Sequence, residues 1–523
     1  MSDTTERPSA STTGSGLTSD LGTSRVATII HGGRTGFRCL DAWEIRERDF
    51  NVVTRGGQST NSQRWVLTDT GGGLYTIMQV SSDRYLDAHE IESLDFRVVT
   101  RPRQDNDTQL WRILSDGGRA AIHQVSSGRA LQPYLTEDMD FQVVTRPPSD
   151  DDIQWLWGPF LDGVFAVDRS AEFERPSAVG APTAYVIPGL GVQNIVYRDT
   201  THQLQLLTRD SQGVTGWDPL TAAARITDPN TPLATGDPFG YVDTTRNTEI
   251  LLYRSRDDGS VHSLSWSTSR PSHNNLSGDA GTPPAEGNPV GYYMPITGDH
   301  RVIYRESHGH LYYLSWDGGI NVGGYDRTAT FHAPAAVGDP TAFVTATGVE
   351  LAVYRSESDG HIRSLWAEEA TGFGVDDLSG VAGTPPAVGD PVGYYTAHDD
   401  TMQVVYRADH GRLYELYAAG NATISGWNIM PDDAPSAIGT PAAYYSPGTN
   451  TKHVAYRSAD DRLHEIWWVP GESTTNYIEP PMLAGEDLHA KARPAAFAVP
   501  GANSLHLAYR GNDRDIYELR RWW

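Results

Sequence analysis

The chain has 523 residues, a formal net charge of −25, 52 glycines, 32 prolines and a single cysteine, Cys39. The acidic balance argues against nucleic acid and anionic membrane surfaces as partners, because both favour clustered Lys and Arg. A lone cysteine excludes an intrachain disulfide and a cysteine-rich metal site, and we expect neither a cofactor nor a bound metal.

Residues 1–24 are rich in Ser, Thr and Gly and lack the apolar core of a secretory signal. We therefore expect a disordered tail on a protein that is cytoplasmic or released without a signal peptide. Because no apolar run approaches the length of a membrane span, we expect no membrane insertion.

Residues 25–160 hold three copies of a unit of roughly 46 residues. Each copy contains Asp-Phe-x-Val-Val-Thr-Arg, at 49–55, 95–101 and 140–146. The first two copies end in Gln-x-Trp, and the third ends near Trp155-Leu-Trp157. Short runs rich in Val, Phe, Tyr and Trp, repeated three times, predict a β-trefoil. We expect Trp65, Trp111 and Trp157 in its core, with Trp155 in place of the third glutamine.

This pattern resembles the ricin B-chain lectin family, in which each lobe can bind a sugar through an early aspartate, a stacking aromatic and polar residues near the Gln. The resemblance implies carbohydrate-binding residues in two lobes: Asp41, Trp43, Asn61 and Gln63, and Asp87, His89, Asn106 and Gln109. Trp43 and His89 are included because valines occupy the usual position of the stacking aromatic. The alternative is that the two aspartates only cap turns.

Residues 161–523 carry a Tyr-Arg pair seven times at intervals of about 50 residues. Each unit has four strand-like parts, beginning with Gly-x-Pro, and seven such units predict a seven-bladed β-propeller. The last unit ends after its third strand. We therefore expect residues 163–178 to supply the fourth strand and close the ring, which would remove exposed sheet edges.

The propeller strands resemble the fungal fucose-binding lectin family, which binds sugar between blades through an Arg, a Glu twelve residues later and an aromatic. The resemblance implies roles for Arg301, Glu415, Glu465 and Glu518, although no blade has the complete pair. The Tyr-Arg arginines share the strand face of the family's Arg and are further ligand candidates: Arg198, Arg254, Arg305, Arg355, Arg407, Arg457 and Arg510. Alternatively, each of them tethers the adjacent blade, while the paired tyrosine packs in the core.

The sequence thus predicts an all-β chain, a β-trefoil followed by a seven-bladed β-propeller. The function that we expect is a non-catalytic, multivalent lectin that binds glycans or glycoconjugates and, by resemblance, has a defence- or toxin-associated role. One alternative is a propeller scaffold for protein partners with a trefoil targeting module. Another is a glycosidase with a carbohydrate-binding appendage, although the acids are spread over the repeats instead of forming one carboxylate pair.

Overall fold

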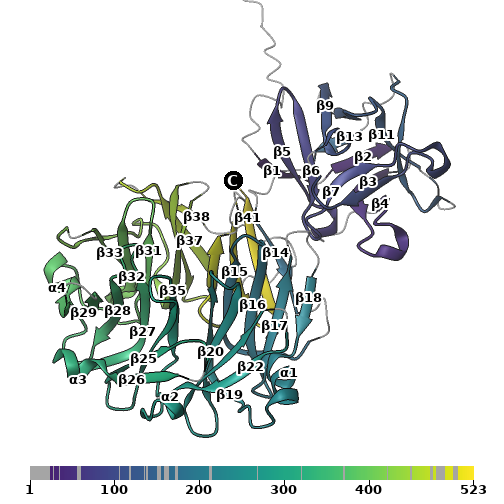
Figure 1. The fold of residues 1–523 in the computed structure, drawn as a ribbon. Helices are drawn as coiled ribbons and strands as arrows, with labels where there is room; N and C mark the ends of the chain where they lie inside the picture. Colours follow the sequence, from purple (N-terminus) through teal and green to yellow (C-terminus); the bar gives the residue numbers. More distant parts are fainter. Residues whose placement is uncertain are drawn as a thin grey trace, which may run out of the picture. The chain divides into compact units, whose positions relative to one another are not determined.

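The chain divides into two compact units, residues 1–163 with 522–523 and residues 164–521, both built from strands (Figure 1). Of the predicted tail, 1–24, only Ser24 is described, and it begins the first strand. No helix in the described ranges is both long and apolar enough to cross a membrane. This computed structural model describes residues 24–522 except 28, 34–35, 56–60, 105, 117–118, 135, 137–138, 150–154, 158–163, 171–174, 211–214, 268, 320, 369–371, 421, 448–449, 472–474, 479–488 and 499–503.

The first unit is a nearly closed, barrel-like sheet of thirteen strands, which is the predicted β-trefoil. Short 3-10 turns join several of its strands: η1 (Arg46–Arg48), η2 (Asn61–Gln63), η3 (Glu92–Leu94) and η4 (Asp107–Gln109). The strands are β1 (Ser24–Ala27), β2 (Ile29–Gly33), β3 (Gly36–Ala42), β4 (Val52–Arg55), β5 (Trp65–Gly71), β6 (Leu74–Gln79), β7 (Tyr85–Ala88), β8 (Val98–Arg101), β9 (Trp111–Asp116), β10 (Arg119–Gln124), β11 (Ala130–Pro133), β12 (Val143–Arg146) and β13 (Trp155–Trp157).

One tryptophan from each lobe fills the trefoil core. Trp65, Trp111 and Trp155 are fully buried, and each indole Nε1 donates to a leucine carbonyl of its own lobe at 2.9–3.0 Å. Trp155 therefore takes the position that Trp65 and Trp111 hold in the other lobes, and the expectation that it replaces the third glutamine is wrong. The indole hydrogen bond fixes the register, and it shifts the glutamine position to residue 153, which lies outside the described residues.

The Asp-Phe-x-Val-Val-Thr-Arg segments tie the three lobes together. Each Asp-Phe pair adopts a left-handed backbone conformation with φ near 50°, as at Asp49 and Phe50. An arginine of another lobe covers each phenylalanine ring, with its Cζ 3.4–3.7 Å from the ring centroid. Backbone bonds such as Thr100 N–H to the Phe50 carbonyl, at 3.0 Å, join the same lobes. The repeated motif is thus explained by interlobe packing.

The second unit is a seven-bladed propeller of four-stranded antiparallel sheets. Blades 1 to 4 each end in a short helix. Blade 1 comprises β15 (Ala178–Ile187), β16 (Val192–Asp199), β17 (Leu204–Arg209), β18 (Thr215–Asp218) and α1 (Leu220–Thr227); blade 2 comprises β19 (Ala234–Asp243), β20 (Thr248–Ser255), β21 (Val261–Trp266), β22 (Ser272–Asn275) and α2 (Leu276–Asp279). Blade 3 comprises β23 (Val290–Met294), β24 (Asp299–Arg305), β25 (Leu311–Trp316), β26 (Val322–Asp326) and α3 (Arg327–Phe331); blade 4 comprises β27 (Ala336–Val344), β28 (Glu350–Ser356), β29 (Ile362–Glu368), β30 (Gly372–Asp377) and α4 (Leu378–Ala382).

The last three blades complete the ring. Blade 5 comprises β31 (Val392–Thr396), β32 (Thr401–Arg407), η7 (Asp409–Gly411), β33 (Leu413–Ala419) and β34 (Ser425–Asn428). Blade 6 comprises β35 (Ala437–Ser446), β36 (Thr451–Ser458), β37 (Leu463–Trp468) and β38 (Asn476–Ile478). Blade 7 comprises β39 (Ala495–Ala498), β40 (Ser504–Arg510), β41 (Ile516–Trp522) and β14 (Val164–Asp168).

Blade 7 joins segments from the two ends of the second unit. The strand β14 pairs antiparallel with β41, and the two lie side by side in Figure 1. Directly after β14, Ser170 Oγ accepts a hydrogen bond from the Ile516 N–H at 3.0 Å, as Thr328 and Ser379 hydroxyls do in blades 3 and 4. The segment therefore supplies both the fourth strand and the hydroxyl that follows it in other blades.

The Gly-x-Pro segments form a hydrogen-bonded collar between blades. The Asp237 carboxylate accepts from the Ala181 N–H at 2.9 Å, Asn288 Oδ1 accepts from the Asp237 N–H at 2.8 Å, and Asp339 accepts from the Asn288 N–H at 3.0 Å. In each of these contacts, the side chain of the middle residue of one Gly-x-Pro accepts a hydrogen bond from the backbone N–H of the middle residue in the preceding blade. Glycine is required at Gly338, where φ is +78° and a Cβ would overlap the Asp390 carboxylate.

Candidate functional site

The two predicted trefoil aspartates are sealed inside their lobes. Asp41 and Asp87 are fully buried, and each carboxylate accepts from its own backbone neighbour and from the Gln side chain, Gln63 at 3.2 Å and Gln109 at 3.4 Å. Arginine guanidiniums lie 3.7–3.9 Å from these carboxylates. The structure thus brings each predicted Asp and Gln together, but it leaves neither aspartate exposed to solvent.

The predicted stacking rings already have partners. Guanidiniums of Arg48 and Arg55 both lie 4.1 Å from the Trp43 ring centroid. His89 Nε2 lies 2.9 Å from the Asp49 carboxylate of the neighbouring lobe, and Arg101 contacts the same imidazole at 3.1 Å. Both rings are therefore already in contact with charged side chains, and the His89–Asp49 contact joins two lobes.

The two predicted amide partners bond within their own loops. Asn61 Oδ1 accepts from Arg64 at 3.0 Å, and Asn106 bonds Gln104 and Thr108 at 3.1 and 2.8 Å.

The Tyr-Arg pairs divide between core and interblade contacts. All seven tyrosines are at most 1% exposed, which confirms their core role. The arginine Nε donates to the glycine carbonyl of the next blade's Gly-x-Pro at 2.7–3.0 Å for Arg198, Arg305, Arg407 and Arg510. The bond from Arg510 to the Gly180 carbonyl closes the ring between blades 7 and 1. Arg254 and Arg457 instead bond an alanine carbonyl or an aspartate, and the guanidinium of Arg355 lies beside Gly338. We interpret the set as tethers.

The three predicted acids of blades 5 to 7 form buried pairs. Glu415 receives Lys452 Nζ of the next blade at 2.9 Å and the Trp427 indole at 2.8 Å. Glu465 and Glu518 each lie 2.6 Å from Nδ1 of the histidine twelve residues earlier. The spacing of twelve therefore does bring two polar side chains together across strands two and three.

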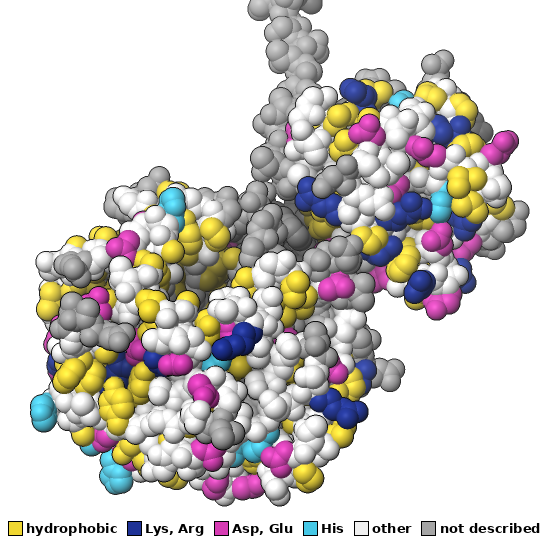
Figure 2. Space-filling view, in the orientation of Figure 1, with side chains coloured by type: hydrophobic (Ala, Val, Ile, Leu, Met, Phe, Trp, Pro, Cys, Tyr) yellow, Lys and Arg dark blue, Asp and Glu magenta, His cyan; other side chains and the backbone are white. Residues whose placement is uncertain are grey.

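A cavity of about 730 Å³ lies between blades 3 and 4. Arg301 and the residue twelve positions later, Tyr313, both line it, together with Tyr325 from the fourth strand. Its remaining polar lining includes Thr297, Thr330, Glu350 and Glu368, and its apolar lining includes Met294, Ile296, Phe331 and Phe373. Figure 2 shows hydrophobic side chains gathered beside basic ones on the part of the propeller where Figure 1 places α3 and β29.

Arg301 and Glu350 form the polar centre of this cavity. Arg301 Nε donates to Glu350 Oε1 at 3.0 Å, while its Nη atoms bond Asp299 at 3.2 Å and Thr297 at 3.3 Å. The fully buried Arg327 places Nη1 3.5 Å from Glu350 Oε2. Two guanidiniums thus hold one carboxylate in place, with oxygen lone pairs left for further donors.

Burial and neighbouring groups shift the pKa of three side chains in this cavity. Burial lowers the pKa of Arg301, but interactions with Tyr313, Glu350 and Asp299 outweigh it and raise the pKa overall. Burial raises the pKa of Tyr313 and of Tyr325. At neutral pH the cavity therefore offers a charged guanidinium and two protonated phenols, which can each donate and accept hydrogen bonds.

The aromatic rings give the cavity flat walls. Tyr313 and Tyr325 lie with centroids 5.1 Å apart, and Phe331 and Phe373 stack at 4.5 Å. Such rings can cover the apolar C–H face of a sugar while polar groups bond its hydroxyls. The arrangement suits a neutral, polyhydroxylated ligand.

Glu350 and Arg327 were missed by the sequence predictions, which searched for an acid within the same blade. The acid comes instead from the next blade, one residue before the position that matches Arg301. Glu249 and Lys452 occupy the same register in blades 2 and 6, and both reach back to the preceding blade. Arg327 begins α3 at the position where α2 and α4 begin with Leu276 and Leu378. An arginine that replaces leucine at this point of the repeat is the sequence signal that could have identified it.

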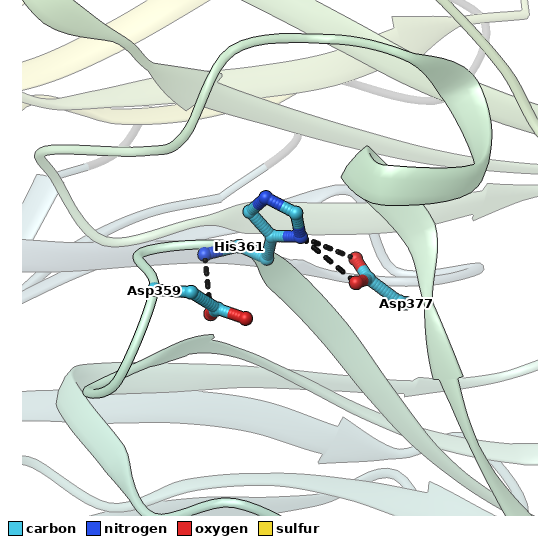
Figure 3. A group of neighbouring side chains, drawn as sticks. All are labelled: Asp359, His361 and Asp377. Atoms are coloured by element: carbon cyan, nitrogen blue, oxygen red, sulfur yellow. Dashed lines mark hydrogen bonds and ion pairs between the residues drawn. The ribbon is translucent and has the colours of Figure 1, made fainter.

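A second group, Asp359, His361 and Asp377, has the donors for a cation within 4.8 Å (Figure 3). The Arg363 guanidinium already lies 2.6 Å from Asp359 and 3.3 Å from Asp377, so a charge partner is present. Asp377 also caps α4 by accepting from the Gly380 N–H, and blade 3 repeats the His–Asp pair without the extra aspartate. We interpret the group as a structural helix cap.

The comparisons with known proteins agree with the trefoil. Residues 61–138 match the ricin-type β-trefoil lectin domain-like family. The chain thus carries a ricin-type lectin-like domain, while a comparison with curated protein sequences gave no match.

Three solved structures illustrate the likeness in fold. The designed protein ThreeFoil is 23% identical, with 26% of this chain and 98% of that chain covered and a TM-score of 0.24. The six-bladed Aleuria aurantia lectin is 14% identical, with 60% and 100% covered and a TM-score of 0.40. The BP39L lectin from Burkholderia pseudomallei is 14% identical, with 66% and 96% covered and a TM-score of 0.49. At these identities the likeness concerns the fold alone.

Proposed function

We propose that the chain is a non-catalytic carbohydrate-binding protein and that its propeller binds a neutral sugar in the cavity between blades 3 and 4. The observation that carries this proposal is the Glu350 carboxylate, held by Arg301 and Arg327 within a cavity walled by aromatic rings. A positioned carboxylate accepts hydrogen bonds from vicinal hydroxyls, and a tyrosine ring covers the opposite, apolar face of the pyranose.

The trefoil supplies a separate unit of lectin-like character, so we propose multivalent binding. Two linked weak sites gain ~10²–10⁴ in apparent affinity on a surface that both can reach. Binding to glycosylated surfaces, as in a defence-associated role, is the setting that we propose for such avidity.

A glycosidase is the second candidate, because Glu350 and Glu368 line the same cavity. Glycoside hydrolysis needs two carboxyl groups at one site, one of which must carry a proton. The Glu350 carboxylate already contacts the guanidiniums of Arg301, at 3.0 Å, and Arg327, at 3.5 Å, which hold it in place. Turnover of an aryl glycoside by the native chain, abolished by Glu368→Gln, would establish the enzyme instead.

A glycan array probed with the full chain tests the proposal. We expect binding to neutral glycans that weakens at least tenfold in Glu350→Gln and persists in Glu286→Gln, an exposed matched control. Absence of binding to every glycan would remove the lectin proposal. Binding that survives in Glu350→Gln but is lost in Asp41→Asn or Asp87→Asn would move the site to the trefoil.

A further inference from the structure

We propose that the cavity has two subsites, an inner polar one for the sugar and an outer apolar one for an uncharged aglycone, so that the preferred ligand is a glycoside with an alkyl or aryl group. This inference rests on the proposed function of the same cavity, which it extends from a sugar to a class of glycoconjugate.

The residues that line the cavity differ widely in exposure. Arg301, Tyr313 and Glu350 are largely buried and carry the polar groups. Ile296 and Phe373 are 66% and 57% exposed, although both line the same cavity. The Arg301–Glu350 pair therefore lies deep, and two large apolar side chains lie at the mouth, beside the exposed Thr297 and Thr330.

The apolar side chains at the mouth are held by packing. Phe373 stacks on the buried Phe331 with centroids 4.5 Å apart and an interplanar angle of 30°. Ile296 lies against Gly348 of the next blade, where a Cβ would press on the isoleucine Cδ1 at 2.6 Å. Two blades thus present a preorganised apolar surface, so a ligand that binds there orders few protein side chains and loses little conformational entropy.

The size of the cavity leaves room beyond one sugar ring. At about 730 Å³ it falls in the range of roughly 300–1,000 Å³ typical of pockets that enclose drug-sized ligands. Exposed large apolar side chains beside a polar site commonly mark a contact surface for a ligand. Glu368 also lines the cavity, so an anionic aglycone is disfavoured and a neutral one fits.

The test is a calorimetric titration of the full chain with matched methyl and hexyl glycosides of the sugar that binds best in a methyl-glycoside panel. We expect the hexyl glycoside to bind about tenfold tighter or more, since each buried methylene contributes to affinity. In Phe373→Ala the hexyl-to-methyl affinity ratio should fall to within about threefold of one. Leu190→Ala, an exposed leucine in blade 1, should keep the native ratio.

The outcomes separate the two proposals. Equal affinity for methyl and hexyl glycosides would overturn the aglycone subsite and leave the sugar site standing. A tighter hexyl glycoside whose advantage survives in both Phe373→Ala and Ile296→Ala would also overturn it, because the apolar contact would lie elsewhere. No binding of any methyl or hexyl glycoside would overturn the sugar site, and the subsite with it.

Discussion

At the residue scale, Arg301 and Arg407 show how two arginines with similar strand settings differ in role. Arg301 lines the cavity and bonds Glu350, Asp299 and Thr297, whereas Arg407 bonds the backbone carbonyls of Gly439 and Val388. A ligand-binding guanidinium faces an open space with a paired acid, and a tether ends on carbonyls of the neighbouring blade. Only the three-dimensional contacts distinguish the two.

Separate substitutions of these two arginines should distinguish an effect on glycan binding from an effect on stability. Arg301→Lys should weaken glycan binding about tenfold or more with little change in unfolding, because an ammonium cannot reach three partners at once. Arg407→Ala should lower the free energy of unfolding by about 1–3 kcal/mol without affecting glycan affinity. Calorimetric affinity and thermal melting of both variants check this. Unchanged glycan affinity in Arg301→Lys together with reduced affinity in Arg407→Ala would contradict it.

Glu249 gives a prediction of pH dependence. Burial raises its pKa to about 7, while Tyr185 and Asn194 donate to its carboxylate at 2.9 and 2.7 Å. Between pH 4.5 and 7 the folded carboxyl keeps a proton that the unfolded one has lost. The free energy of unfolding therefore falls as pH rises through this window, by up to about 3 kcal/mol.

Glu249→Gln should remove this loss, because an amide keeps the acceptor oxygen and does not ionise. In urea unfolding, the free energy of unfolding of the variant relative to that of the native chain should be higher at pH 8 than at pH 5. The exposed Glu286→Gln serves as the control. A Glu249→Gln variant whose stability relative to the native chain is the same at both pH values would contradict the assignment.

At the element scale, the Gly-x-Pro collar explains a motif that the sequence shows only as a strand entry. The x side chains of Asp237, Asn288 and Asp339 each accept a backbone hydrogen from the preceding blade. Periodicity predicted seven blades of four strands, because Tyr-Arg recurs in all seven units and Gly-x-Pro in the first six. It could not predict which side chains meet between blades, since those contacts depend on the rotation from one blade to the next.

The collar makes a glycine substitution informative. Gly338→Ala should destabilise the propeller by more than about 2 kcal/mol, because the new Cβ would overlap the Asp390 carboxylate at a positive φ. Gly383→Ala, also at a positive φ but with open space around the Cβ, should cost only about 1 kcal/mol. Thermal melting compares the two variants, and equal losses would show that the collar contact is unimportant.

At the scale of the whole molecule, one segment near residue 164 completes a blade whose other strands come from the C-terminus. The sequence predicts this closure because the seventh unit stops after its third strand and 163–178 resembles the exit of a blade. The repeat pattern predicted the binding-site residues less well than it predicted the fold. Arg301 lines the cavity, but its partner acid comes from a different blade, and the trefoil aspartates are buried.

Ring closure can be tested by truncation. A chain that starts at residue 164 should fold cooperatively, whereas one that starts at residue 178 lacks β14 and Ser170 and leaves the β41 edge unpaired. We expect the shorter chain to melt at a lower temperature and to associate in size-exclusion chromatography. Identical melting of the two chains would contradict the closing role of β14.

The affinity of Glu350→Gln for the best-bound neutral glycan tests the central claim most directly. The claim predicts a loss of at least tenfold, because the amide cannot replace a carboxylate held by two guanidiniums. The Glu286→Gln control should keep the native affinity, and the melting curve of each variant reports whether its fold is retained. A folded Glu350→Gln chain that binds the glycan with unchanged affinity would show that the cavity between blades 3 and 4 is not the sugar site.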